Sequence, residues 1–100
     1  MAYQVVWSPN AIEDVDEIAS YIAKDSVAYA AAVVRKILDT TRNLSNFPLS
    51  GRIVPELGDP AIREKLVYSY RVIYRVEAET ITIAAVIHGK RQLESEMNES

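Results

Sequence analysis

The sequence lacks cysteine and is poor in the residues that mark metal or covalent sites. Its 100 residues include one histidine and three glycines. The missing cysteines exclude disulfides, a thiol nucleophile and cysteine-based zinc sites. His88, without a G-x-S-x-G context, gives no support to a hydrolase triad, and no glycine-rich loop follows a strand and opens a helix. The sequence therefore predicts no metal and no cofactor.

Long apolar runs are also absent. The longest lies within residues 81–87, far short of the roughly 20 residues that span a bilayer. The chain does not open with a basic segment followed by an apolar run, so we expect no membrane contact and a cytoplasmic location. With 49% hydrophobic and 25% charged side chains, the composition indicates one globular domain. We place it at residues 1–91, followed by an acidic polar tail at 92–100.

Positive charge is scarce overall but unevenly distributed. The formal net charge is −3 and the pI is about 5.1. Residues 51–91 nevertheless hold seven basic and five acidic side chains, ahead of a tail that adds three glutamates. The total charge does not favour nucleic-acid binding. The local excess is compatible with chance scatter or with a basic functional surface.

Hydrophobic periodicity predicts a strand, two helices and three further strands. Ser8 and Pro9 suit the N-cap and the first position of a helix, and Ser26 can cap a second helix after a short connection. The expected elements are a strand at 3–7, helices beginning near 9 and 27, a loop at 49–60 with a brief extended piece at 53–54, and strands at 62–68, 70–77 and 80–87. This β-α-α-β-β-β order predicts an α+β fold, with a helical hairpin packed on one face of a mostly antiparallel sheet.

Alternation along the predicted strands sorts their side chains onto two faces. If the apolar sets face the helices, the cations gather on the open face. In the last strand the expected apolar set is Ile81, Ile83, Ala85 and Ile87. The expected open face holds Arg63, Lys65, Arg71, Arg75 and His88, with Lys90 and Arg91 just past its edge. Glu64 is discordant, because it is directed inward, where it pairs with an arginine or marks a bulge.

This predicted face has two interpretations. Exposed strand faces commonly carry arginine or lysine merely for solvation. The convergence of the four cations and the only histidine, five residues in all, favours a functional surface. Arginine or lysine could neutralise a phosphorane, and histidine or tyrosine could transfer protons, as metal-free RNA cleavage requires.

Several segments resemble the RelE/ParE superfamily of type II toxin–antitoxin toxins. They are Y-R-V-I-Y at 70–74, I-H-G-K-R at 87–91, G-R-I-V-P-E-L at 51–57, I-R-E at 62–64, and an N-terminal pattern of Trp7, Ala11, Asp14, Ile18 and Tyr21-Ile22. Together they cover nearly the whole chain. The segments at 51–57 and 62–64 resemble the ParE-like branch, often described as plasmid stabilisation proteins. The resemblance implies a RelE/ParE toxin-like fold and a cognate antitoxin that wraps the toxin with a helix and an extended segment.

The resemblance implies two alternative mechanisms. ParE-like members poison DNA gyrase and are not enzymes; the target-binding surface would then be Arg63, Arg71, Arg75, His88, Lys90 and Arg91. RelE-like members are metal-independent endoribonucleases that cut messenger RNA on the ribosome. Their basic residues would match Arg63, Lys65, Arg71 and Arg91, with His88 compensating for a catalytic tyrosine that falls near Met97.

Three features favour the gyrase poison: the missing tyrosine, the segment at 51–57 and the pI of about 5.1. The pI is informative because nucleases that work inside the ribosome are usually strongly basic. A third alternative is a degenerate member that only binds its antitoxin.

Overall fold

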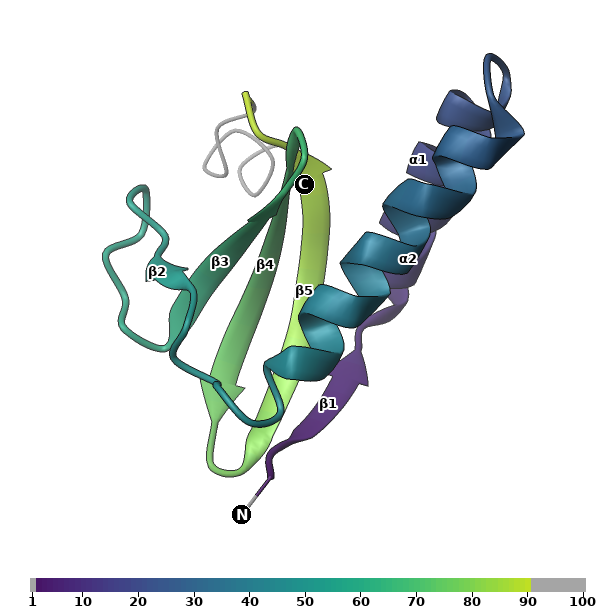
Figure 1. The fold of residues 1–100 in the computed structure, drawn as a ribbon. Helices are drawn as coiled ribbons and strands as arrows, with labels where there is room; N and C mark the ends of the chain where they lie inside the picture. The colour runs from purple at the N-terminus through teal and green to yellow at the C-terminus, as the bar shows by residue number, and fades with distance from the viewer. Residues whose placement is uncertain (1, 91–100) are drawn as a thin grey trace.

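The computed structural model describes residues 2–90, which form a layer of helices against a layer of sheet (Figure 1). In chain order the elements are β1 (Gln4–Trp7), α1 (Pro9–Ala23), α2 (Val27–Asn43), β2 (Arg52–Ile53), β3 (Ile62–Val67), β4 (Tyr70–Glu77) and β5 (Thr80–His88). The predicted α+β fold is confirmed. The brief strand β2 begins one residue before the expected extended piece.

The five strands form one mixed sheet in the order β1-β5-β4-β3-β2. β1 runs parallel to β5, and the other neighbouring pairs are antiparallel. The N-terminal strand therefore lies beside the last strand, as Figure 1 shows. The two antiparallel helices form a hairpin that covers one face of the sheet. In this layer α1 packs on β5 and α2 contacts β3.

Two serines begin the helices where the sequence predicted. Ser8 Oγ accepts a hydrogen bond of 3.0 Å from Ala11 N, and Pro9 occupies the first helical turn. Ser26 Oγ accepts one of 3.0 Å from Tyr29 N. Each serine satisfies a backbone donor that the first helical turn leaves without an intrahelical partner. Within residues 2–90, neither helix is long and apolar enough to cross a membrane.

A β-bulge in β5 exchanges the two faces of that strand. Ile73 pairs with Ala85, but the next residue, Tyr74, pairs with Ile83, so Ala84 is the extra residue. Beyond a bulge the alternation of side chains is displaced by one position. The prediction that Ile81, Ile83, Ala85 and Ile87 share one face is therefore wrong. Only the first two belong to the core beneath the helices, which Val86 joins.

Helix α1 holds this bulge through polar side chains. Ser8 Oγ donates to Ala84 O at 3.1 Å. The Asp14 carboxylate accepts from Val86 N at 2.9 Å. Backbone groups released from the regular ladder by the extra residue thus find partners in the helix.

The sheet has a hydrophobic core on each face. The larger core, between sheet and helices, contains Ala11, Val33, Ile37, Leu44, Val67, Val72, Tyr74, Ile81, Ile83 and Val86. The smaller one lies on the opposite face and contains Val54, Ile73 and Ile87. Val54 belongs to the connection after β2, so this loop folds over the face that the sequence predicted to be open.

Tyr74 connects the two layers to the loop. Its buried hydroxyl accepts from Gly51 N at 2.9 Å and donates to Pro48 O at 2.9 Å. Burial raises the pKa of the Tyr74 phenol above its usual value. A Cβ on Gly51 would lie 2.5 Å from Glu64 O and 2.6 Å from the Tyr74 hydroxyl oxygen. Glycine is therefore required where the loop passes over β3.

We expect Tyr74→Phe to lower the free energy of unfolding by about 1–3 kcal/mol, because it leaves the buried Gly51 N–H without its acceptor. Urea denaturation monitored by circular dichroism measures this change. Tyr68→Phe is the matched control, since the Tyr68 side chain is 58% exposed. Equal stability losses in the two variants would contradict the bridging role.

Candidate functional site

The cations predicted on one open face are divided between the two faces of the sheet. In β3, Arg63 pairs with Tyr74 and Lys65 pairs with Val72, so both cations lie on the helix side. Arg71 and Arg75 belong to the opposite side, because they alternate with those β4 residues. The predicted single cationic face is wrong, since β3 turns its charged residues in the sense opposite to that assumed.

Glu64, not Arg63, shares the face of Ile73. Its side chain is fully buried there, away from the helices, so the expected inward direction was wrong. The expectation that Glu64 pairs with an arginine is confirmed. Arg71 and Arg52 both bind its carboxylate.

Arg71 is the most constrained charged residue of this face. Its side chain is only 5% exposed. Nη1 and Nη2 bind the Glu56 carboxylate at 2.7 and 2.8 Å, and Nε donates to Glu64 Oε1 at 2.7 Å. The hydrogen bonds that Arg71 donates to Glu56, and then those to Glu64, raise the pKa of Arg71 despite its burial, which acts in the opposite sense. The expected exposure of Arg71 is therefore wrong, because two carboxylates enclose its charge.

These ion pairs fasten the loop to the sheet. Glu56 follows Val54, whose apolar side chain is buried in the small core. Arg52 Nε donates to the second oxygen of Glu64. The segment is therefore attached to the sheet at Arg52 and again at Glu56. Buried carboxylates and arginines are tolerated together because each charge has an opposite partner and hydrogen bonds.

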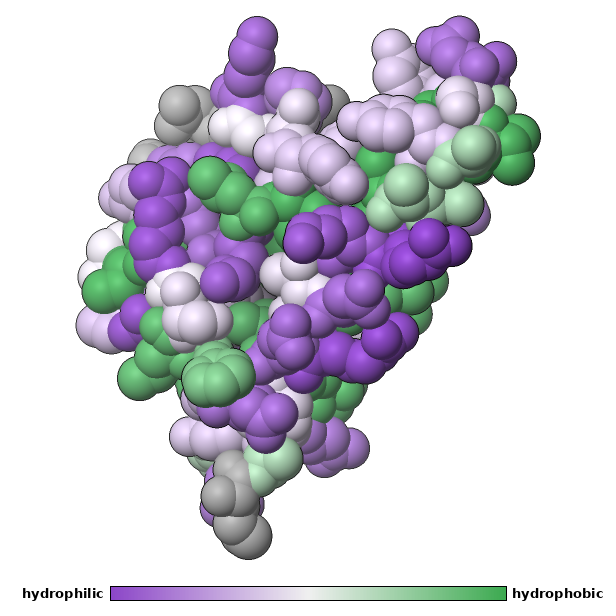
Figure 2. All heavy atoms as spheres, in the orientation of Figure 1, coloured by the Kyte–Doolittle hydropathy of each residue, from purple (hydrophilic) through white to green (hydrophobic). Residues whose placement is uncertain are grey.

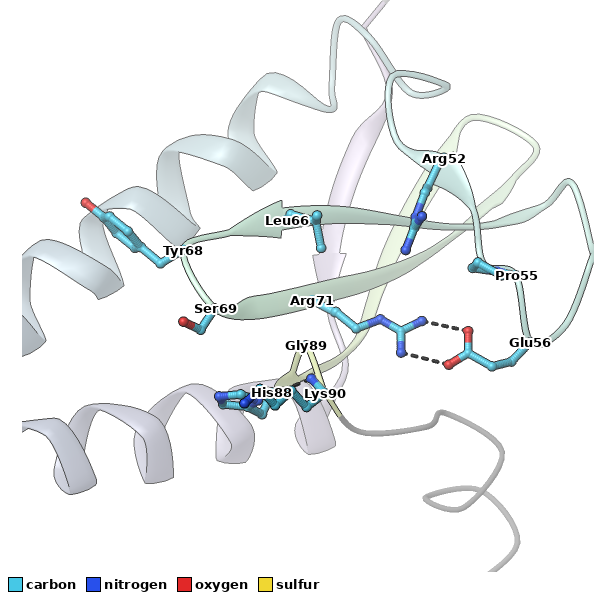
Figure 3. Close-up of a pocket in the computed structure, with 10 residues that line it drawn as sticks. All are labelled: Arg52, Pro55, Glu56, Leu66, Tyr68, Ser69, Arg71, His88, Gly89 and Lys90. Carbon is cyan, nitrogen blue, oxygen red and sulfur yellow. Dashed lines mark hydrogen bonds and ion pairs between the residues drawn. The ribbon is translucent and has the colours of Figure 1, made fainter.

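A cavity of about 660 Å³ opens beside Arg71, and we call it the Arg71 cavity (Figure 3). In the close-up, Arg71 points toward Glu56 across the cavity, while His88 and Lys90 lie at the end of β5. Its lining residues are Arg52, Pro55, Glu56, Leu66, Tyr68, Ser69, Arg71, His88, Gly89 and Lys90. Leu66 is 63% exposed, so the rim of the cavity is apolar as well as basic.

His88 is positioned by the strand end and by its neighbour. It pairs with Tyr70, which places it on the helix side of the sheet. The two rings meet edge to face, with centroids 5.8 Å apart. Lys90 N donates to His88 Nδ1 at 3.2 Å. This bond assigns the proton of the neutral imidazole to Nε2, which then donates and does not accept.

Of the other predicted residues, Arg63, Lys65 and Arg75 do not line the Arg71 cavity. Arg63 Nε donates to Pro60 O at 2.9 Å, and its Nη1 donates to Gly51 O at 3.0 Å, so it braces the loop. Lys65 lies in a separate small cleft. Arg75 is exposed on the face of the sheet opposite the helices, outside the lining of the Arg71 cavity. Lys90 is exposed past the end of β5, as predicted. Arg91, Met97 and the predicted tail at 92–100 lie outside the described residues.

Sequence reasoning missed Glu56, which binds Arg71, and Arg52, which shares the Glu64 carboxylate with it. The discordant Glu64 was the available signal, because a buried carboxylate requires a cation nearby. The identity of that cation depends on the loop path, which alternation does not predict. Within residues 2–90, no group of three histidine, aspartate or glutamate side chains could hold a metal ion.

A second surface feature runs along the outside of the helical hairpin. It is an apolar groove of about 670 Å³ between α1 and α2, lined by Ala19, Ser20, Ala23, Val27, Ala30, Ala31, Val34, Arg35, Leu38 and Arg42. Figure 2 shows apolar side chains gathered near the tip of the hairpin on an otherwise largely polar face. Val27 is 73% exposed there. The many alanines leave room for the backbone of another helix to approach closely.

Comparison with known proteins places this geometry in a family. The family described as the ParE toxin of the type II toxin–antitoxin system parDE matches residues 5–93. The chain belongs to the ParE toxin family. A candidate toxin of Sinorhizobium fredii, Y4kP, is 32% identical over 92 residues, covering 89% of this chain and 91% of that protein.

Solved ParE and RelE relatives share the fold. A structure of the chromosomal ParDE system from P. aeruginosa superposes with a TM-score of 0.72 at 20% identity, covering 87% of this chain and 96% of that one. The RelBE2 toxin–antitoxin complex from Mycobacterium tuberculosis gives 0.61 at 24% identity, covering 88% and 99%. A YoeB/ParE toxin from Agrobacterium tumefaciens gives 0.63 at 17% identity, covering 85% and 96%. These likenesses show that the chain has the fold of RelE/ParE toxins.

In this ParE-family chain, Arg71→Ala should reduce the free energy of unfolding by about 3–5 kcal/mol, because it removes the partner of Glu56 and leaves the buried Glu64 charge with only the exposed Arg52. Arg75→Ala, on the same strand and face but exposed, should change it by no more than about 0.5 kcal/mol. Equilibrium denaturation compares the two. A loss below 1 kcal/mol for Arg71→Ala would mean that its ion pairs do not hold the loop.

Proposed function

We propose that this toxin stops growth by binding and poisoning DNA gyrase, without catalysis of its own, and that a cognate antitoxin neutralises it in a plasmid stabilisation system. The observation that carries the proposal is the closure of Arg71 by Glu56 and Glu64. An arginine already paired with two carboxylates does not neutralise the charge that develops on a phosphate during RNA cleavage. The ParE match is consistent with this preference.

The other groups needed for RNA cleavage are also poorly placed. The Nδ1 atom of His88 accepts from Lys90 N, so the neutral imidazole lacks a lone pair on Nε2 with which to remove a 2′-hydroxyl proton. Arg63 is bound to loop carbonyls. Lys65 lies on the helix side of the sheet, away from Arg71. A pI of about 5.1 opposes binding dominated by phosphate contacts.

A ribosome-dependent messenger endoribonuclease is the second candidate. One observation favours it: the Arg71 cavity brings Arg52, Arg71, His88 and Lys90 to one place. These are residue types that such an enzyme uses. The cavity would serve this chemistry only if Glu56 released Arg71.

For the gyrase interaction, we propose the rim of the Arg71 cavity as the target-binding surface. Leu66 and Tyr68 are exposed apolar side chains, and Arg52, His88 and Lys90 add polar and basic groups around them. Exposed aromatic and basic residues around an apolar centre are typical of protein-binding surfaces. Arg75 is excluded, because it lies four residues along β4 from Arg71, about 13 Å away.

The antitoxin is proposed to place an amphipathic helix in the groove between α1 and α2. The lining alanines permit close helix packing, and Arg35 and Arg42 at its border would attract acidic side chains of that helix. The RelBE2 neighbour is itself a toxin–antitoxin complex. A helix bound along the hairpin leaves the Arg71 cavity uncovered, so an extended segment would have to cover the target-binding surface.

The target is tested with purified gyrase and plasmid DNA. We expect the toxin to inhibit supercoiling and to accumulate cleavage complexes. Lys90→Glu should weaken this inhibition at least roughly tenfold, because it reverses charge at the rim of the target-binding surface. Arg75→Glu makes the same reversal elsewhere on the exposed sheet and should leave inhibition unchanged. Unimpaired supercoiling together with messenger cleavage in a translating extract would reject the gyrase proposal in favour of the nuclease.

The antitoxin site is tested with the cognate antitoxin. Ala31→Arg places a large cation in the groove and should weaken antitoxin binding roughly 30-fold or more, the size of a hot-spot loss. Ala28→Arg is the matched control, because Ala28 is exposed on the same helix outside the groove. Isothermal titration calorimetry compares the two. Equal affinities would contradict the proposed position of the helix.

A further inference from the structure

The Arg71 cavity has the composition of an anion-binding site in which the bound anion is a side chain of the protein, the Glu56 carboxylate. The Arg71 guanidinium forms its floor, and Arg52 and Lys90 belong to its lining. The Glu56 carboxylate, 11% exposed, binds the guanidinium edge formed by Nη1 and Nη2. Nε and Nη2 bind the fully buried Glu64 at 2.7 and 2.6 Å, so Nη2 is shared between the two carboxylates.

The contact between Glu56 and Arg71 has the geometry in which arginine binds phosphate. A planar guanidinium donates two parallel hydrogen bonds to two oxygens of either a carboxylate or a phosphate. Here the two bonds are 2.7 and 2.8 Å long. A phosphate group in the cavity would therefore compete with Glu56 for the same pair of donors.

Glu56 can leave without disrupting a core. Its neighbours Pro55 and Leu57 are exposed, and the loop is anchored independently by buried Val54 and by the bond between Arg52 and Glu64. Release of Glu56 would leave Arg71, Arg52 and Lys90 around the cavity, opposed by Glu64. The local charge would then favour an anion.

We propose that Glu56 is a built-in phosphate mimic that closes a phosphate-binding site on Arg71. The occupant that it excludes is a phosphate group, whether free or in the backbone of a nucleic acid. The resident carboxylate keeps the basic cavity from retaining nucleic acid non-specifically, which suits a protein that acts on another protein. This inference is independent of gyrase as the target, since it concerns only which anion occupies Arg71.

The test is Glu56→Gln in the full chain, titrated with inorganic phosphate and separately with a short single-stranded RNA. NMR signals of the Arg71 Nε–H group report binding at this site. We expect the variant to bind phosphate at least about tenfold more tightly than the wild type, because a competing charge is removed. Binding of the RNA as well would identify nucleic acid as the excluded source, and binding of inorganic phosphate alone would identify a free phosphate.

Glu79→Gln is the control, because it removes one negative charge from the exposed turn between β4 and β5. It should bind phosphate as the wild type does. If Glu56→Gln does not fold, the wild type provides a second measurement. High phosphate concentrations should then shift the Glu56 carboxylate and Arg71 Nε–H signals together, with one midpoint.

Equal phosphate affinity in Glu56→Gln and Glu79→Gln would overturn the inference. If Glu56→Gln does not fold, wild-type signals of Glu56 and Arg71 that shift with different midpoints would also overturn it. Neither result bears on gyrase inhibition, which the supercoiling assay measures separately.

Discussion

The ion pairs of Arg71 connect parts of the chain that share little regular secondary structure. The strand β2 contributes only two residues to the sheet. Glu56, in the loop after β2, and Glu64, in β3, nevertheless bind the same guanidinium. Together with buried Val54 and the bond between Arg52 and Glu64, these ion pairs hold the loop against the face of the sheet opposite the helices. The closure of the Arg71 cation depends on them.

The bulge at Ala84 is the second constraint, and it acts on β5, the strand that carries Ile87 and His88. Without the extra residue, Ile87 would lie beneath the helices and His88 would face the loop. With it, Ile87 packs against Val54 and His88 sits beside Tyr70. Because α1 supplies the hydrogen bonds that stabilise the bulge, the helical hairpin influences a site that it does not cover.

The sequence predicted what depends on local chemistry and failed where distant pairing decides. Serine caps and hydrophobic periodicity located both helices, because these signals act within one helical turn. Strict alternation failed in β5, since no local feature marks the alanine at 84 as an extra residue. It failed in β3 because the face of Glu64 depends on pairing with Ile73. The enclosed state of Arg71 required the position of Glu56, 15 residues away.

The same loop accounts for the change in meaning of the basic residues. Resemblance to a superfamily containing nucleases made Arg71 a candidate for phosphate chemistry, but a fold carries several functions and the local partners select among them. Here Glu56 and Glu64 offset the charge of Arg71, and Arg63 is committed to loop carbonyls. The exposed cations beside the cavity include Lys90 and Arg52, next to apolar Leu66 and Tyr68. Such a rim, apolar as well as basic, favours a protein partner over a phosphate backbone.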